Sequence, residues 1–62
     1  MIDYKLYADA FSEMAKLHLA IAVQNSRLGF SNAEKIESTI ATSFFNRATE
    51  YQELADKEAE NA

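Results

Sequence analysis

Hydrophobic residues recur every three or four positions along most of the chain, which is the spacing of amphipathic α-helices. The single break in this pattern lies at residues 28–32. Gly29 is the residue type that adopts the left-handed conformation after a helix, and Arg27 suits the negative end of the helix dipole. Ser31 and Glu34 then form an S-x-x-E capping box. The pattern therefore predicts two helices joined by a short turn.

The boundaries of these elements follow from the same signals. We expect a first helix over about residues 3–28, with Asp3 as its N-cap, a turn at 29–31, and a second helix over about 32–58. Two long helices joined by a short loop form an antiparallel hairpin. The sequence thus predicts one all-α domain over residues 1–62, whose acidic last ten residues fray.

The apolar surface of the first helix is too wide for a single neighbouring helix to cover. It spans roughly 200°, whereas the apolar stripe of an ordinary surface helix spans about 100°. Alanine recurs every seven residues, and these small side chains allow another helix to approach closely. The alanines of this row are Ala8, Ala15 and Ala22. We therefore expect a second surface to cover what the partner helix of the hairpin leaves open.

A chain of this length cannot easily bury a core of its own. It has 62 residues, no Cys and one His, so disulfides are excluded and a stabilising metal site is not expected. We expect a homodimer in which two hairpins form an antiparallel four-helix bundle with the first helix central. A lone hairpin that awaits a foreign partner is the alternative. The candidate dimer core comprises Phe11, Met14, Ala15, His18, Ile21, Ala22 and Asn25.

Three polar residues interrupt the apolar stripes. A polar core residue such as Asn25 commonly fixes helix register or oligomeric state. His18 is interpreted as a neutral core residue bonded to a hydroxyl or carbonyl of a facing helix, with a pH switch, proton transfer or ligand binding as alternatives. Arg47 either pairs with Asp9 or Glu13 across the hairpin, extends its head group into water, or contacts an anion or a partner.

The second helix offers a candidate surface for a partner. Phe45 lies beside the apolar stripe, and an exposed aromatic side chain there indicates an interface, either with a second copy or with another protein. The neighbouring segment is rich in hydroxyl side chains, which we expect to donate to carbonyls four residues earlier or to form a polar docking face. The candidate partner interface comprises Ala41, Thr42, Phe45, Arg47 and Thr49.

Composition argues against several classes of function. The formal charge is −4, and the basic residues share a stripe with acidic ones, so nucleic-acid binding is not expected. No membrane-span or signal-peptide pattern is present, so we expect a complete cytoplasmic gene product that spans no membrane. No nucleophilic triad, E-x-x-H pair or phosphate-binding glycine loop occurs, so we expect neither an enzyme nor a cofactor or metal.

The expected function is protein interaction, as a small dimeric regulator or inhibitor that binds a cellular host protein, in the manner of small bacterial or phage proteins. One alternative is a dimer that binds a small molecule in a pocket lined by His18, Asn25, Arg47 and tyrosines. A second is a structural subunit of a larger assembly. A third is an RNA-binding bundle, because Rop-type RNA-binding proteins are also dimers of helical hairpins; the likeness is one of size and topology alone.

Overall fold

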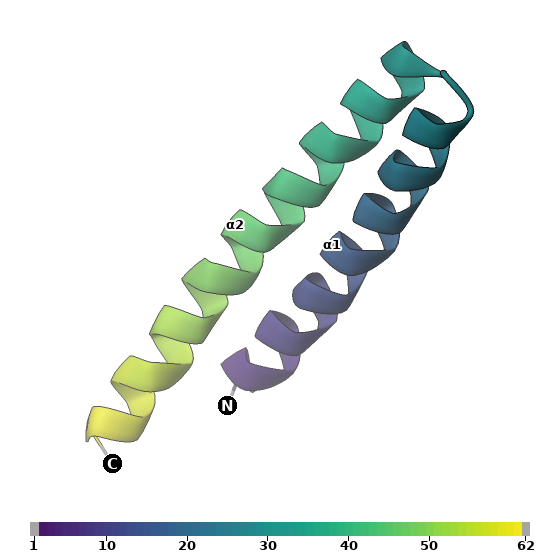
Figure 1. Ribbon diagram of the computed structural model, residues 1–62. Coiled ribbons are helices and arrows are strands. Elements are labelled where there is room, and N and C mark those ends of the chain that lie inside the picture. Colours follow the sequence, from purple (N-terminus) through teal and green to yellow (C-terminus); the bar gives the residue numbers. More distant parts are fainter. Residues whose placement is uncertain (1, 62) are drawn as a thin grey trace.

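The chain forms a helical hairpin. The computed structural model describes residues 2–61, and these contain two α-helices, α1 (Tyr4–Arg27) and α2 (Ser31–Asn61). The helices run antiparallel in a rod of 50 × 14 × 12 Å, and α2 extends past the start of α1 at the open end (Figure 1). The all-α hairpin predicted from the sequence is confirmed.

Both ends of α1 are closed by the residues that the sequence indicated. Gly29 has a φ of 77°, which other residue types adopt only with strain. Its amide donates to the Ser26 carbonyl at 3.1 Å, and the Phe30 amide donates to the Asn25 carbonyl at 2.9 Å. These two bonds form a Schellman motif, which satisfies the last carbonyls of the helix. At the other end, the Asp3 carboxylate accepts a first-turn amide at 3.1 Å and is the N-cap.

Both ends of α2 differ from the prediction. The capping box is not formed: Ser31 is already helical, and the Glu34 amide donates to the Phe30 carbonyl at 2.9 Å. The Schellman turn returns the chain to helix directly after Phe30, so Ser31 never occupies the cap position. At its other end α2 continues to Asn61, through the segment that was expected to fray. That segment has no Gly or Pro and is rich in Ala and Glu, which favour helix.

Small side chains form the closest contact between the helices. Among the described residues, those that are buried are Ala8, Ala15 and Ala22 on α1 and Ala41 on α2. The row of alanines predicted to admit a second helix therefore admits α2 of the same chain. No side chain larger than alanine is fully buried within residues 2–61.

Aromatic rings fill the spaces beside these alanines. Tyr4 and Tyr7 stack on Tyr51, with ring centroids 6.2 and 5.3 Å apart. Phe11 stacks on Tyr51 at 5.6 Å and on Phe44 at 5.8 Å. The three tyrosines thus cluster at the open end, and each ring pair contributes about 0.5–1.5 kcal/mol beyond its burial. We use the name seam for the buried alanines and these stacked rings together. The seam holds the two helices in register.

Candidate functional site

An apolar face runs along one side of the hairpin. We call it the leucine face, and it consists of Leu6, Met14, Leu17 and Ile21 on α1 with Ile36 and Leu54 on α2. The α1 residues follow helical spacing, and the two α2 residues are eighteen positions, or about five turns, apart. Each side chain is between 40% and 65% exposed. The hairpin thus leaves these six large apolar side chains in contact with water.

A groove between the helices runs along the opposite side. It consists of two hollows, one after the other, which we together call the Phe45 groove. The hollow nearer the turn is lined by residues that include Leu19, Val23, Arg27, Glu34 and Ser38, and the other by residues that include Phe45, Thr49 and Gln52. Phe45 is nine positions from both Ile36 and Leu54, about two and a half turns, so it points to the opposite side of α2. Two positions separate Leu19 from Leu17 on α1, which is a rotation of about 200°. The leucine face and the Phe45 groove are therefore separate surfaces.

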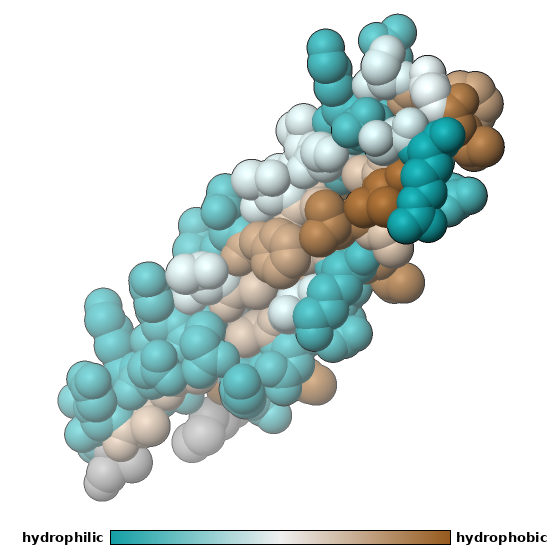
Figure 2. Space-filling view, viewed as in Figure 1, coloured by the Kyte–Doolittle hydropathy of each residue, from teal (hydrophilic) through white to brown (hydrophobic). Residues whose placement is uncertain are grey.

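Charge is concentrated away from the turn. In Figure 2, hydrophobic atoms run along the line between the helices in the half nearest the turn, whereas hydrophilic atoms cover the open end. The acidic residues of the last turns of α2 are Glu50, Glu53, Asp56, Glu58 and Glu60, against one cation, Lys57. The half nearest the turn carries Arg27 and Lys35 beside Glu34 and Glu37 and is close to neutral, whereas the open end is acidic.

A polar pair connects the helices beside the leucine face. His18 Nδ1 and Glu37 Oε2 share a hydrogen bond of 2.5 Å, and the His18 ring stacks on Phe44 with centroids 5.4 Å apart. The two side chains are 32% and 22% exposed. Met14 and Ile21 lie one turn on either side of His18, so a molecule bound to the leucine face would also shield this pair from water.

The sequence predicted that His18 has a partner on the facing helix, but the chemical group predicted for that partner was wrong. The partner is a carboxylate, where a hydroxyl or carbonyl was expected. In the sequence, Glu37 resembles Glu34, an ordinary surface carboxylate. Its position seven residues before Phe44 places it on the seam side of α2, and this spacing was the available signal.

The predicted dimer-core residues are divided between the seam and the leucine face. Met14 and Ile21 are exposed on the leucine face, where a second chain can reach them. The others are buried or half-buried within the hairpin itself: Phe11, Ala15, His18, Ala22 and Asn25. The division arises because α2 covers the middle of the wide apolar arc of α1 and leaves one flank open.

The predicted partner-interface residues do not lie on a single surface. Phe45 is 40% exposed and shares its side of α2 with the exposed residues Thr42 and Thr49. Ala41 is 2% exposed and belongs to the seam, so it has no surface left for a partner. Arg47 is two positions from Phe45 and lies on the side of the leucine face. Leu19 and Val23, which the sequence did not single out, complete the apolar part of the Phe45 groove.

Arg47 does not use either of the acids proposed for it. Asp9 pairs with Lys5 at 3.1 Å, and Glu13 pairs with Lys16 at 3.3 Å. Arg47 is exposed and forms no ion pair within the described residues. Its side chain is thus the one cation beside the leucine face in the middle of α2.

The hydroxyl groups of α2 bond as predicted. Four side chains donate to the carbonyl four residues earlier at 2.9–3.1 Å, namely Thr39, Thr42, Ser43 and Thr49. A hydroxyl that donates to its own helix leaves its methyl or methylene group toward the surroundings. Of these four, Thr49 lines the Phe45 groove, where its hydroxyl is already bonded to its own helix.

The described part of the chain has neither a metal-binding cluster nor a membrane-spanning helix. Residues 2–61 contain no group of three His, Cys, Asp or Glu side chains placed to hold a metal ion. Neither helix has the length and hydrophobicity needed to cross a membrane.

No protein-family model matches the chain, and comparison with curated proteins and with solved structures finds no significant similarity. A proposal of function therefore rests on the residues of this chain.

Proposed function

We propose that the protein is a small, non-enzymatic interaction protein that acts as a homodimer. Two hairpins pack through their leucine faces into a four-helix bundle, and the Phe45 groove of each hairpin binds another protein, whose activity the dimer regulates or inhibits. The observation that carries this proposal is the contrast between the seam and the leucine face. The seam fully buries nothing larger than alanine, while six large apolar side chains remain exposed beside it.

The accessible surface area of the hairpin is larger than that expected for a monomer of its mass, which supports a missing partner. It is 4729 Å², whereas a folded monomer of 7.0 kDa is expected to expose about 4,000 Å². The excess, on the order of 700 Å², is close to the roughly 800 Å² that each partner contributes to a standard protein interface. The leucine face, which has Arg47 between its two α2 residues, is the surface that could supply this area.

The energy available at the leucine face is comparable with the cost of association. Full burial of a large apolar side chain is worth about 1.5–3 kcal/mol, so a half-exposed one gains about 1 kcal/mol. The six side chains of each hairpin then supply about 12 kcal/mol to a dimer, against an association cost of about 4–15 kcal/mol. Gain and cost are of similar size, so each leucine-face residue should have a measurable effect on the dimer.

The dimer leaves the Phe45 groove accessible, because the groove lies on the opposite side of the hairpin. Phe45 is the large aromatic side chain of its middle part, and aromatic anchors commonly carry much of the binding energy in protein interfaces. Each bundle would present two such grooves, one per hairpin, on opposite sides.

Sedimentation equilibrium tests the dimer with a matched pair of variants. Leu17→Glu places a charge at the centre of the leucine face, and Ala20→Glu places the same charge at an exposed position outside that face. We expect the wild-type chain and Ala20→Glu to sediment at about 14 kDa, twice the mass of 7.0 kDa, and Leu17→Glu at the single-chain mass. A wild-type monomer, or a dimer that survives in Leu17→Glu, would contradict the proposal.

A further inference from the structure

The Phe45 groove has an acidic wall beside its aromatic residue. The lining of its middle part contains three carboxylates, Asp9, Glu53 and Asp56, and one cation, Lys5. Three negative charges against one positive charge give this part of the groove a net charge of −2. Because these side chains line the hollow that contains Phe45, they face any molecule that lies in it.

The single lysine of this lining is already engaged. Lys5 Nζ lies 3.1 Å from Asp9 Oδ1 and donates to Gln52 Oε1 at 2.9 Å. The Gln52 amide in turn donates to Asp56 Oδ1 at 2.9 Å. Neither Glu53 nor Asp56 has a cation partner within the described residues. A hydrogen bond therefore orients the Asp56 carboxylate in the groove. The negative charges of Asp56 and Glu53 are not balanced by an ion pair.

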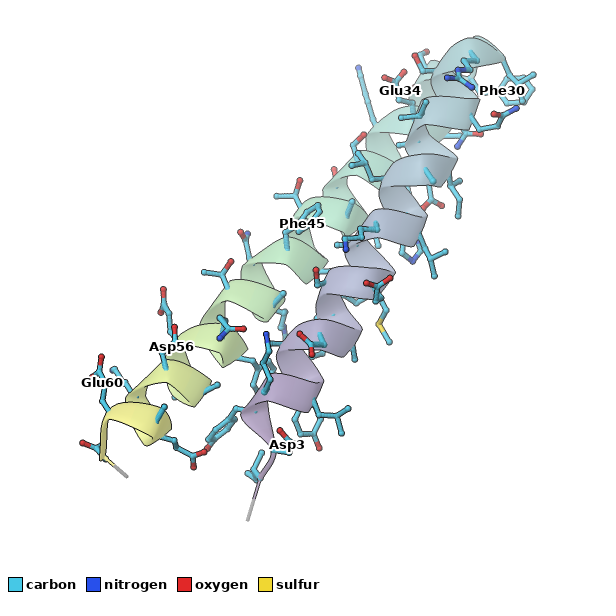
Figure 3. The ribbon with its side chains drawn as sticks, turned by 60° about the horizontal axis from the view of Figure 1, so that its bottom comes forward. Asp3, Phe30, Glu34, Phe45, Asp56 and Glu60 are labelled. Atoms are coloured by element: carbon cyan, nitrogen blue, oxygen red, sulfur yellow. The ribbon has the colours of Figure 1, made fainter. Side chains whose placement is uncertain are left out.

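Apolar and acidic groups follow each other along the groove. Figure 3 shows Phe45 midway along α2 and Asp56 nearer the open end. From Phe45 to Glu53 the helix rises by eight residues, about 12 Å. Toward the turn, Leu19 and Val23 line the second hollow together with Arg27 and Glu34, whose opposite charges balance. A complementary molecule therefore needs an apolar stretch followed, about two helical turns away, by positive charge.

We propose that the Phe45 groove binds a basic amphipathic helix of another protein. The groove lies between two antiparallel helices, and a third helix packs in such a groove through side chains at positions i, i+4 and i+7. Its apolar residues contact Phe45, Leu19 and Val23, and its Lys or Arg side chains pair with Glu53 and Asp56. Charged pairs at this edge also select against acidic helices. This inference rests on the proposed function and names the class of partner that the same groove recognises.

Selection from a display library of random 20-residue helical peptides tests the inference while the partner protein is unidentified. We expect enriched peptides to carry Lys or Arg about two turns from an apolar pair, and to bind at least tenfold more weakly to Phe45→Ala. The Glu53→Gln/Asp56→Asn variant should weaken them by a similar factor. The matched control, Glu58→Gln/Glu60→Gln, removes two charges from the same helix outside this lining and should change binding less than twofold.

The outcomes separate this inference from the function on which it rests. Neutral or acidic peptides that lose binding to Phe45→Ala would overturn the basic helix and leave the groove as a binding site. Equal losses in the two charge variants would show binding to general negative charge, which also overturns the inference. Failure to enrich any peptide sensitive to Phe45→Ala would overturn both the inference and the proposed role of the groove. Circular dichroism of each variant confirms that helix content is retained.

Discussion

The hydrogen bond between His18 and Glu37 should couple the two helices energetically. Bonds that involve a charged group are worth about 1.5–3 kcal/mol, and exposures of 32% and 22% reduce this to about 1–2 kcal/mol. We predict that a double-mutant cycle of His18→Ala and Glu37→Ala gives a coupling energy in this range. The His18–Phe44 stacking is lost both in His18→Ala and in the double variant, so its contribution cancels from the cycle.

Urea denaturation followed by circular dichroism measures this coupling. Protein concentration must be held constant, because the stability of a dimer depends on it. The exposed pair of Lys16 and Glu13, at 3.3 Å, is the control and should couple by about 0.5 kcal/mol or less. A coupling between His18 and Glu37 that is no larger than that of the control pair would refute the idea that they link the helices.

Three further changes should alter stability by predictable amounts, each measured by the same denaturation assay. Gly29→Ala should cost about 1 kcal/mol through its φ of 77° alone, since no atom lies within 4 Å of an added Cβ; a neutral effect would contradict the strained turn. Ala15→Leu should cost about 1–3 kcal/mol by overpacking the seam, whereas Ala20→Leu at an exposed position should cost less than about 0.5 kcal/mol. Asp3→Ala should cost about 1 kcal/mol by removing the N-cap of α1, and full stability would show that the cap is dispensable.

The hairpin could be predicted because its turn has an unambiguous local signal. A lone glycine followed by a new helical pattern permits few backbone arrangements, and the observed Schellman motif is one of them. The alanine row was also readable, since small residues seven positions apart on one helix indicate a close helix contact. The absence of a capping box at Ser31 could not be predicted. A capping box depends on the residue at which the preceding turn ends and the helix begins, and residue types alone do not give that position.

Which part of the apolar arc α2 covers could not be predicted from α1 alone. Successive residues of an α-helix are about 100° apart around its axis. A rotation of α1 by less than this angle would exchange seam and exposed positions. The rotation is set by pairs such as Phe11 with Phe44 and His18 with Glu37, which depend on both helices. The sequence thus placed Phe11 and Met14 together in a dimer core, whereas one lies in the seam and the other is exposed.

The proposed function depends above all on a second copy of the chain that covers the leucine face. Isotope-filtered nuclear Overhauser spectroscopy on an equal mixture of ¹³C-labelled and unlabelled protein detects contacts between copies directly. A dimer through this face predicts intermolecular signals from the methyl groups of Leu6, Leu17 and Ile21 and none from Leu19 and Val23 of the Phe45 groove. Intermolecular signals from Leu19 and Val23 instead would place the second copy in the groove, and the absence of any intermolecular signal at millimolar concentration would contradict the dimer itself.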